Sequence, residues 1–492
     1  MRLFFLTCLV LVSAALFAQY DFNNRCRLAY EEIVRLNFQD ASTLLSLERS
    51  ENPGNLIPVL FGNYIDFLTI LIGEEENQFI QLKGNYQERI RLLEKGNRNS
   101  PYYLFSLAQV NLQWAFARIK FGDYLRAALE IQKSYRFLKE NQAKFPEFKP
   151  NLLGMGMLHV LVGSVPDNYQ WVTGLFSMEG SIKQGVDEIS EYIEWSVKQN
   201  DDFLVPEALF FLSFVNINFS VDRSEGIPFE EKLRSMAPES PLMTFAYGRM
   251  LIKHGRNDDA ILLFRNRISD EKQFTFYYLD YLTGLCMLHK LDIECRPYFY
   301  RFVSNFRGMN YIAEAWQKLA WSYILEGDTV NYFACMDKVR KYGNTFTDED
   351  KIALKEAESG YIPNVILLKS RLLFDGAYFT SAEEELLKSS RFLRNALDST
   401  EYFYRLGRIN DASGKFISAR SYYLKTIERG SDLKRYFAAN AALNLGIIYE
   451  NEENVKDAEK YFRLCRSLDF DEYETGIKQK AKAGLNRLNE KY

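Results

Sequence analysis

The feature that most constrains this chain is a unit that recurs along its second half. Each unit carries one small residue among large apolar residues at helical spacing, and a second apolar stretch follows after a break. The small residues are about 36 to 39 residues apart, with one gap of about 50, and are Gly248, Gly284, Ala320, Ser370, Gly407 and Gly446. A period of this length predicts an array of structural units, each packed mainly against its neighbours.

The clearest unit is "AALNLGIIYENEENVKDAEKYFRLC" at residues 441–465. We expect Gly446 where two helices of a hairpin cross, because a larger side chain there would force the helices apart. Phe462 and other large residues would fill the space beside the crossing. A glycine near the middle of a unit, such as Gly327, is expected to end the first helix in a conformation that a side chain would penalise.

These positions match the tetratricopeptide pattern W-x2-L-G-x2-Y…A-x3-F, and the chain resembles the tetratricopeptide repeat superfamily over most of its mature length. The resemblance implies an all-α fold, a right-handed α-solenoid of tetratricopeptide-like helical hairpins. We expect a degenerate tetratricopeptide-like helical region at 19–235 and a repeat array at 236–492. The long gap is explained by an additional helix, "DEDKIALKEAES", at 348–359.

The glycine-rich stretch 154–189 suggests three other structures: a phosphate loop, a membrane segment and a site around His159. Its glycines lie inside an apolar helical run with no strand before them, the run is too short to span a membrane, and His159 has no ligand-type neighbour at metal-binding spacing. We therefore expect a closely packed helix pair. Residues 150–215 resemble the eukaryotic inclusion-body-clearance (outer-membrane-type) tetratricopeptide family in the order of a glycine-containing helix, a proline turn and a glycine element.

The first 18 residues have the charged, apolar and small-residue sections of a secretory signal peptide. We expect cleavage after Ala18, leaving Gln19 first, with cleavage after Ala15 as the alternative. Cys8 lies inside the apolar section rather than at a lipid-attachment position. The sequence therefore predicts a bacterial protein, periplasmic or secreted, without a lipid anchor. No later segment predicts an integral membrane span, since the closest candidate, 55–73, carries Asp66 near its middle.

The five remaining cysteines form no CxxC pair and are too few for a disulfide framework. We expect buried free thiols, with a Cys286–Cys295 disulfide as the alternative. The 61 basic and 65 acidic residues give a net charge of −4, which excludes a field that would attract nucleic acid. Because no catalytic or phosphate-binding motif is present, we expect no enzyme activity, no cofactor and no metal site.

Tetratricopeptide solenoids bind partners with the first helix of each unit. The expected inward positions combine aromatic rings with guanidinium groups, which can stack on an extended peptide and bond its carboxylates. The main hypothesis is an exported, non-catalytic scaffold or adaptor for a protein or peptide partner in the cell envelope. The alternative is a cell-envelope glycan-binding protein of a nutrient-uptake system. The predicted ligand-binding residues are Phe245, Arg249, Tyr278, Tyr281, Trp321, Tyr404 and Arg408.

Overall fold

The computed structural model describes residues 19–164, 178–219, 226–268, 270–343, 345–388 and 393–491. Over these residues the chain forms helices, and the extended backbone pairs in a single isolated bridge between Gln19 and Asn55. Across the described segments, none of the helices combines the length and the apolar character that a bilayer span requires. The predicted signal peptide at 1–18 lies outside the described residues.

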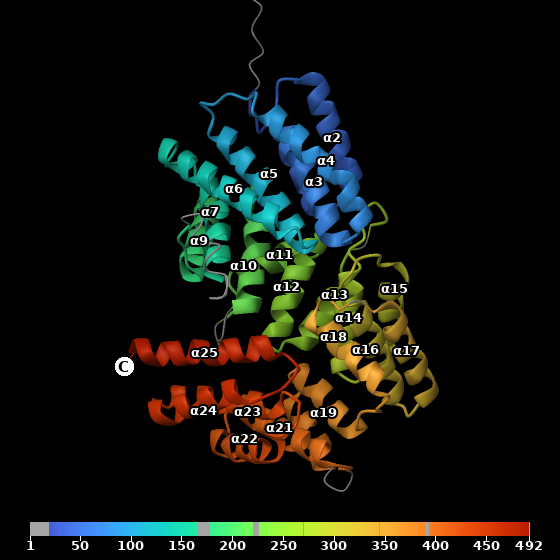
Figure 1. Ribbon diagram of the computed structural model, residues 1–492. Coiled ribbons are helices and arrows are strands. Elements are labelled where there is room, and N and C mark those ends of the chain that lie inside the picture. Colours follow the sequence, from blue (N-terminus) through green and yellow to red (C-terminus); the bar gives the residue numbers. More distant parts are fainter. Residues whose placement is uncertain are drawn as a thin grey trace, which may run out of the picture. The chain divides into compact units, whose positions relative to one another are not determined.

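The chain divides into two compact units, and one of the boundaries between them falls within the helix α12. The N-terminal unit takes in the described residues of 19–222, 228–247 and 267–275. Its consecutive helices pack as antiparallel pairs, for example α5 with α6 and α7 with α9 (Figure 1). Its helices are α1 (Asn24–Val34), α2 (Phe38–Glu51), α3 (Ile57–Gly73), α4 (Glu76–Leu93), α5 (Pro101–Lys120), α6 (Tyr124–Lys144), α7 (Pro150–Ser164), α9 (Ile182–Gln199), α10 (Val205–Phe219), α11 (Glu230–Met236) and the first half of α12 (Pro241–Lys253).

The C-terminal unit consists mainly of the described residues of 248–266 and 276–491. It is again a run of helical hairpins, and together the two units confirm the predicted fold class, an all-α solenoid of tetratricopeptide-like hairpins. Its helices after α12 are α13 (Asn257–Arg265), α14 (Tyr278–His289), α15 (Arg296–Asn305), α16 (Ile312–Ile324), α17 (Thr329–Tyr342), α18 (Asp348–Ser359), α19 (Val365–Asp375), α20 (Phe379–Leu387), α21 (Ala396–Ala412), α22 (Phe416–Gly430), α23 (Phe437–Asn451), α24 (Val455–Ser467) and α25 (Glu474–Lys491).

The small residues lie at the helix crossings, as the repeat pattern predicts. A Cβ added to Gly446 of α23 would lie 2.5 Å from Cδ1 of Phe462 on α24, and one added to Gly407 of α21 would lie 2.6 Å from the Tyr423 ring on α22. Both aromatic rings are fully buried. The missing side chain therefore provides the space that the aromatic ring of the paired helix fills. Gly327, which follows α16, has φ of +80°, so its predicted role in ending the helix is also confirmed.

The glycine-rich stretch forms a close helix pair, although its middle part, 165–177, lies outside the described residues. Gly156 of α7 and Gly185 of α9 meet at the crossing, where a Cβ on Gly156 would lie 2.7 Å from the Gly185 carbonyl oxygen. His159 is buried beside this crossing, and its Nδ1 lies 2.6 Å from Glu188 Oε2 on α9. The expectation of a packing histidine is confirmed.

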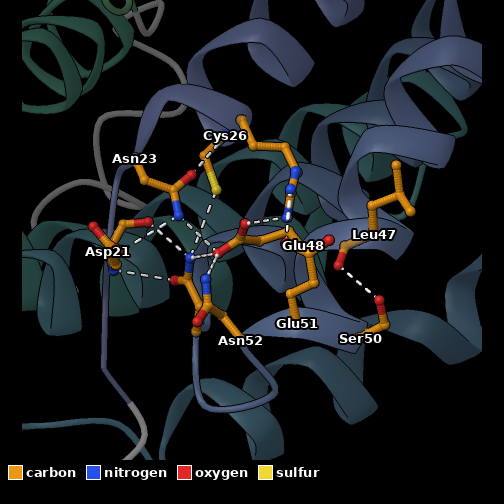
Figure 2. A network of polar contacts seen from close by, with 10 residues as sticks. Asp21, Asn23, Cys26, Leu47, Glu48, Ser50, Glu51 and Asn52 are labelled. Carbon is orange, nitrogen blue, oxygen red and sulfur yellow. Dashed lines mark hydrogen bonds and ion pairs between the residues drawn. The ribbon is translucent and has the colours of Figure 1, made fainter.

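The segment that precedes α1 is attached to the first hairpin by a buried carboxylate. Glu48 of α2 is 1% exposed and accepts hydrogen bonds from the side-chain amides of Asn23, Asn52 and Asn55 at 2.8, 3.0 and 2.9 Å (Figure 2). Burial would raise the pKa of Glu48, but these bonds and the nearby Arg25 guanidinium hold it below its usual value. Gln19 continues the attachment, since its amide donates to Gly54 O and its carbonyl accepts from Leu56 N.

The five cysteines in the described residues are buried and free, which confirms the prediction of free thiols. Burial raises the pKa of the Cys26 thiol to about 12 and that of Cys335 to about 11, so neither thiol ionises at neutral pH. The alternative, a Cys286–Cys295 disulfide, is wrong.

Candidate functional site

The C-terminal unit contains a pocket of about 100 Å³, lined mainly by the first helices of successive hairpins. Residues from α16, α19, α21 and α23 line it, together with the extra helix α18. We call it the arginine pocket, because three arginines line it: Arg371 of α19, Arg405 of α21 and Arg435 of the loop before α23. Its polar and aromatic lining residues include Trp321, Glu356, Tyr361, Asn364, Arg371, Asp398, Glu401, Arg405, Arg435, Tyr436, Glu472 and Tyr473.

The three arginines differ in how well their charge is compensated. Arg405 is nearly buried and its Nη2 lies 2.8 Å from Glu401 Oε1, four residues earlier on α21. Arg435 forms an ion pair with the buried Glu472. Arg371 of α19 is less well compensated. Among the described residues, Asp375 is its one carboxylate neighbour within 4 Å, at 3.8 Å, and 25% of the Arg371 side chain is exposed. Arg371 therefore retains guanidinium N–H groups that can bind an anion.

An indole ring supports the Arg371 guanidinium, whose carbon lies 4.9 Å from the centre of the Trp321 ring. The position of Trp321 is fixed by α18, since its Nε1 donates to Glu356 Oε1 at 2.9 Å. The same oxygen accepts from Tyr332 at 3.1 Å, and Glu356 Oε2 accepts from Gln317 at 2.6 Å. The helix that interrupts the repeat therefore orients the aromatic wall of the pocket.

The lining also includes a carboxylate, Asp398, that already has hydrogen-bond partners. Asp398 accepts from Tyr361 at 3.0 Å, from Asn364 at 2.9 Å and from Arg394 at 3.1 Å. Burial would raise its pKa, but these donors hold the pKa of Asp398 below its usual value, so it remains ionised. Tyr473 is kept neutral because burial raises its pKa to about 12. The lining carboxylates Glu356, Glu401 and Glu472 already have hydrogen-bond or ion-pair partners, as Asp398 does. Arg371 is therefore the cation that a ligand carboxylate could bind in this pocket.

Of the seven predicted ligand-binding residues, the structure places Trp321 in the arginine pocket. Tyr404 is fully buried one turn before Arg408, and its hydroxyl accepts from Arg408 at 2.9 Å and from Asn440 at 2.8 Å. The guanidinium of Arg408 covers the Phe374 ring at 4.7 Å. These residues pack between hairpins instead of lining an open face.

The other predicted residues lie elsewhere. Tyr278 and Tyr281 of α14 are buried in an aromatic cluster with Phe302, and Tyr281 donates to Glu314 at 2.6 Å. Their assignment to an exposed inner face is corrected, because the neighbouring hairpin covers both rings. Phe245 and Arg249 of α12 are half-buried, and Phe245 stacks on Phe210 with ring centres 6.1 Å apart. Neither lines the arginine pocket.

Sequence analysis did not identify Arg371, Arg405 or Glu356. Arg371 stands one position after Ser370, the small residue of its unit, so the repeat register alone could have placed it beside the helix crossing. Glu356 could not be found that way, because α18 lies outside the repeat. Its position follows from the tertiary contact of α18 with α16 and α17.

Comparison with protein-family models finds no match, and comparison with curated proteins finds none either. The similarity of residues 150–215 to the inclusion-body-clearance family therefore gains no support. Among solved structures, the chain is similar to the APC/C hetero-tetramer Cut9-Hcn1, with 12% identity, a TM-score of 0.23, and 95% of this chain and 96% of that chain covered. A circular tandem repeat protein with a novel repeat topology gives 9% identity and a TM-score of 0.15, with 95% and 96% covered. At these TM-scores the fold assignment depends on the hairpins described above.

Proposed function

We propose that this protein is an exported, non-catalytic scaffold that binds a protein or peptide partner of the cell envelope through the inner faces of its hairpins. The arginine pocket is the observation that carries this proposal. Its Arg371 has one distant carboxylate neighbour among the described residues and rests on an indole ring, which is the arrangement that binds a carboxylate bidentately. In a solenoid, several hairpins can contact one extended partner at the same time.

The pocket sets the chemistry of the proposed partner. A volume of about 100 Å³ holds a carboxylate group and little more, so the remaining contacts would come from the surrounding inner face. We propose a peptide whose terminal or side-chain carboxylate binds Arg371 while an adjacent apolar group contacts Tyr436; Trp321, which is 2% exposed, supports Arg371 from below the surface. The partner is thus an acidic or carboxyl-terminal segment of another protein.

The test is fluorescence anisotropy with a peptide library in which each sequence has a free or an amidated carboxyl terminus. We expect Arg371→Gln to weaken binding of the best peptide about 30-fold, because truncating a hot spot costs about 2 kcal/mol. Arg463→Gln is the matched control, since Arg463 is an exposed arginine of the same unit, on α24, paired with Glu459. Equal binding by wild-type protein and Arg371→Gln would contradict the proposed site.

Two further measurements test the remaining parts of the proposal. N-terminal sequencing of the native protein should begin at Gln19 if residues 1–18 are removed on export. Affinity electrophoresis on a panel of polysaccharides separates the scaffold from the glycan-binding alternative. Retardation by any glycan would favour the alternative.

A further inference from the structure

The N-terminal unit contains a different cavity, of about 310 Å³, which we call the apolar cavity. It is lined by residues of α1, α3, α5, α7, α10 and α12. Its walls are mainly aliphatic and aromatic, and include Leu68, Phe116, Phe210, Phe211, Phe214 and Leu242. A cavity of this size lies at the lower end of the range for small-molecule sites.

Two buried glutamines interrupt the apolar wall. Gln109 and Gln113, one turn apart on α5, line the cavity and are 1% and 2% exposed. Within the described residues, neither polar atom of the Gln109 amide has a hydrogen-bond partner, and Gln113 Nε2 also has none. Gln113 is nevertheless held in place, because its Oε1 accepts from Asn63 at 2.7 Å. A buried amide without a protein partner is satisfied by water or by a bound group, so these atoms are available to a polar group that enters the cavity.

A carboxyl group completes the polar part of the wall. Glu207 of α10 lines the cavity and accepts from the Tyr64 hydroxyl at 2.9 Å. Burial raises the pKa of Glu207 to about 7, although the bond from Tyr64 acts in the opposite direction. Lys120 lines the same cavity and forms an ion pair with the buried Glu74. The cavity thus offers hydrogen-bond donors and acceptors within an apolar enclosure.

We infer that the apolar cavity binds a single-chain amphiphile of about ten carbons with an uncharged, hydrogen-bonding head group such as a glycerol ester. The chain length follows from the volume, since about 310 Å³ holds about ten groups of roughly 30 Å³ each. The head group follows from the polar lining: an ester or hydroxyl satisfies the free amide atoms of Gln109 and Gln113. Lys120 is already paired with Glu74 and Glu207 already accepts from Tyr64, so neither side chain offers an uncompensated charge to a charged head group. This inference concerns the N-terminal unit and does not depend on peptide binding by the arginine pocket.

The experiment compares three ligands with the same ten-carbon chain by isothermal titration calorimetry below their micelle concentrations. Monodecanoylglycerol is neutral, decanoate is anionic and decyltrimethylammonium is cationic. We expect the neutral ligand to bind with one-to-one stoichiometry and at least tenfold more tightly than either charged one. Failure of all three to bind, or tighter binding of a charged one, would overturn the inference.

Substitutions assign the binding to the cavity. Leu71 lines it, so Leu71→Trp should fill the space and weaken binding of monodecanoylglycerol at least tenfold. Leu125→Trp is the control, because Leu125 on α6 is 82% exposed and should leave binding unchanged. Phe214→Asp provides a second test if Leu71→Trp does not fold, since Phe214 is half-exposed at the cavity. Unchanged binding by the folded variant would overturn the assignment.

The head-group contact has its own readout. Gln109→Leu removes the free amide but keeps an apolar wall, so we expect about tenfold weaker binding of monodecanoylglycerol. Binding of the purely apolar dye N-phenylnaphthylamine should remain unchanged in the same variant. Equal loss for both ligands would show that Gln109 shapes the cavity without contacting the head group. That result would contradict the inference about the head group.

Discussion

The two units use the same hairpin architecture to make two chemically different inner faces. In the N-terminal unit, the first helices enclose an apolar cavity that also presents the Gln109 amide, Nε2 of Gln113 and the carboxyl group of Glu207. In the C-terminal unit, the equivalent helices present the arginine pocket, in which Arg371 lacks a close carboxylate among the described residues. The residues that pack one helix against another are thus different from the residues that line the cavity and the pocket.

The two units also differ in the role of their charged side chains. Around Glu48 of the N-terminal unit, a carboxylate holds the chain together, and three amides and one guanidinium satisfy it (Figure 2). On the inner face of the C-terminal unit, the charge of Arg371 contributes little to packing. Stability and binding should therefore respond to charge removal in opposite ways in the two units.

The largest effect is expected for Glu48→Ala. The change leaves the amides of Asn23, Asn52 and Asn55 without their acceptor, so the N-terminal unit should lose about 4 kcal/mol of unfolding free energy. Urea unfolding followed by hydrogen exchange of peptides from each unit measures this. Glu51→Ala, which removes an exposed partner of Arg25, is the control and should cost less than about 1 kcal/mol. An equal loss in both variants would contradict the structural role of Glu48.

The second effect is on the C-terminal unit. Gly446→Leu places a side chain where Phe462 already lies, and we expect a loss of about 2–3 kcal/mol in that unit. Gly84→Leu in α4 is matched to it, because Gly84 is a helical glycine with no atom within 4 Å of an added Cβ. That variant should be as stable as wild type or more stable by about 1 kcal/mol. Similar melting of both variants would show that the crossing is loosely packed.

A smaller effect is a difference between the two units in how their stability depends on pH. Because the pKa of Glu207 is raised from 4.5 to about 7, its contribution to stability is complete below 4.5 and is lost as pH rises through 7. Burial lowers the pKa of His289 in the C-terminal unit from 6.5 to about 4, so its contribution is complete above 6.5 and is lost as pH falls towards 4.

Urea unfolding of each unit at pH 5, 6.5 and 8 tests this contrast. We expect the N-terminal unit to lose about 1–2 kcal/mol towards alkaline pH, after allowance for solvent in the open cavity. Glu207→Gln should remove that dependence, and His289→Gln should remove the acid dependence of the C-terminal unit. Parallel curves for the two units would contradict the contrast.

The smallest expected effect is that of Arg371→Gln on stability. Arg371 is partly exposed and its ion pair is long, so unfolding of the C-terminal unit should change by less than about 0.5 kcal/mol. The matched change Arg405→Gln breaks a short, nearly buried pair with Glu401 and should cost about 3 kcal/mol. A large loss of unfolding free energy for Arg371→Gln would show that Arg371 stabilises the fold.

Local spacing was sufficient to predict the hairpins. The small residue and its aromatic partner, such as Gly446 and Phe462, are both fixed by the geometry of one helix pair, so a pattern within about 25 residues locates them. The extra helix at 348–359 was predicted with its observed bounds for the same reason.

The inner-face residues were harder to predict because contacts with later hairpins decide their exposure. Tyr404 has the spacing of a lining residue, yet Asn440 of α23 bonds its hydroxyl and Phe437 packs on its ring. Tyr281 is covered in the same way by Phe302 and Glu314. Arg371 differs from these residues, because 25% of its side chain remains exposed. Sequence spacing indicates on which face of its own helix a side chain lies. It does not indicate how far the next hairpin buries that side chain.

The helix α18 breaks the translational symmetry of the array. In a uniform solenoid, an extended ligand could slide by one repeat and meet nearly the same surface. The extra helix α18 makes the surface around Trp321 different from the equivalent surface of the neighbouring hairpins. Its Glu356 accepts a hydrogen bond from Trp321 at this position. A partner that contacts this position is thereby held in one register. The irregular gap in the repeat therefore distinguishes one binding position along the array from the others. Moving α18 to another junction should move that binding position with it.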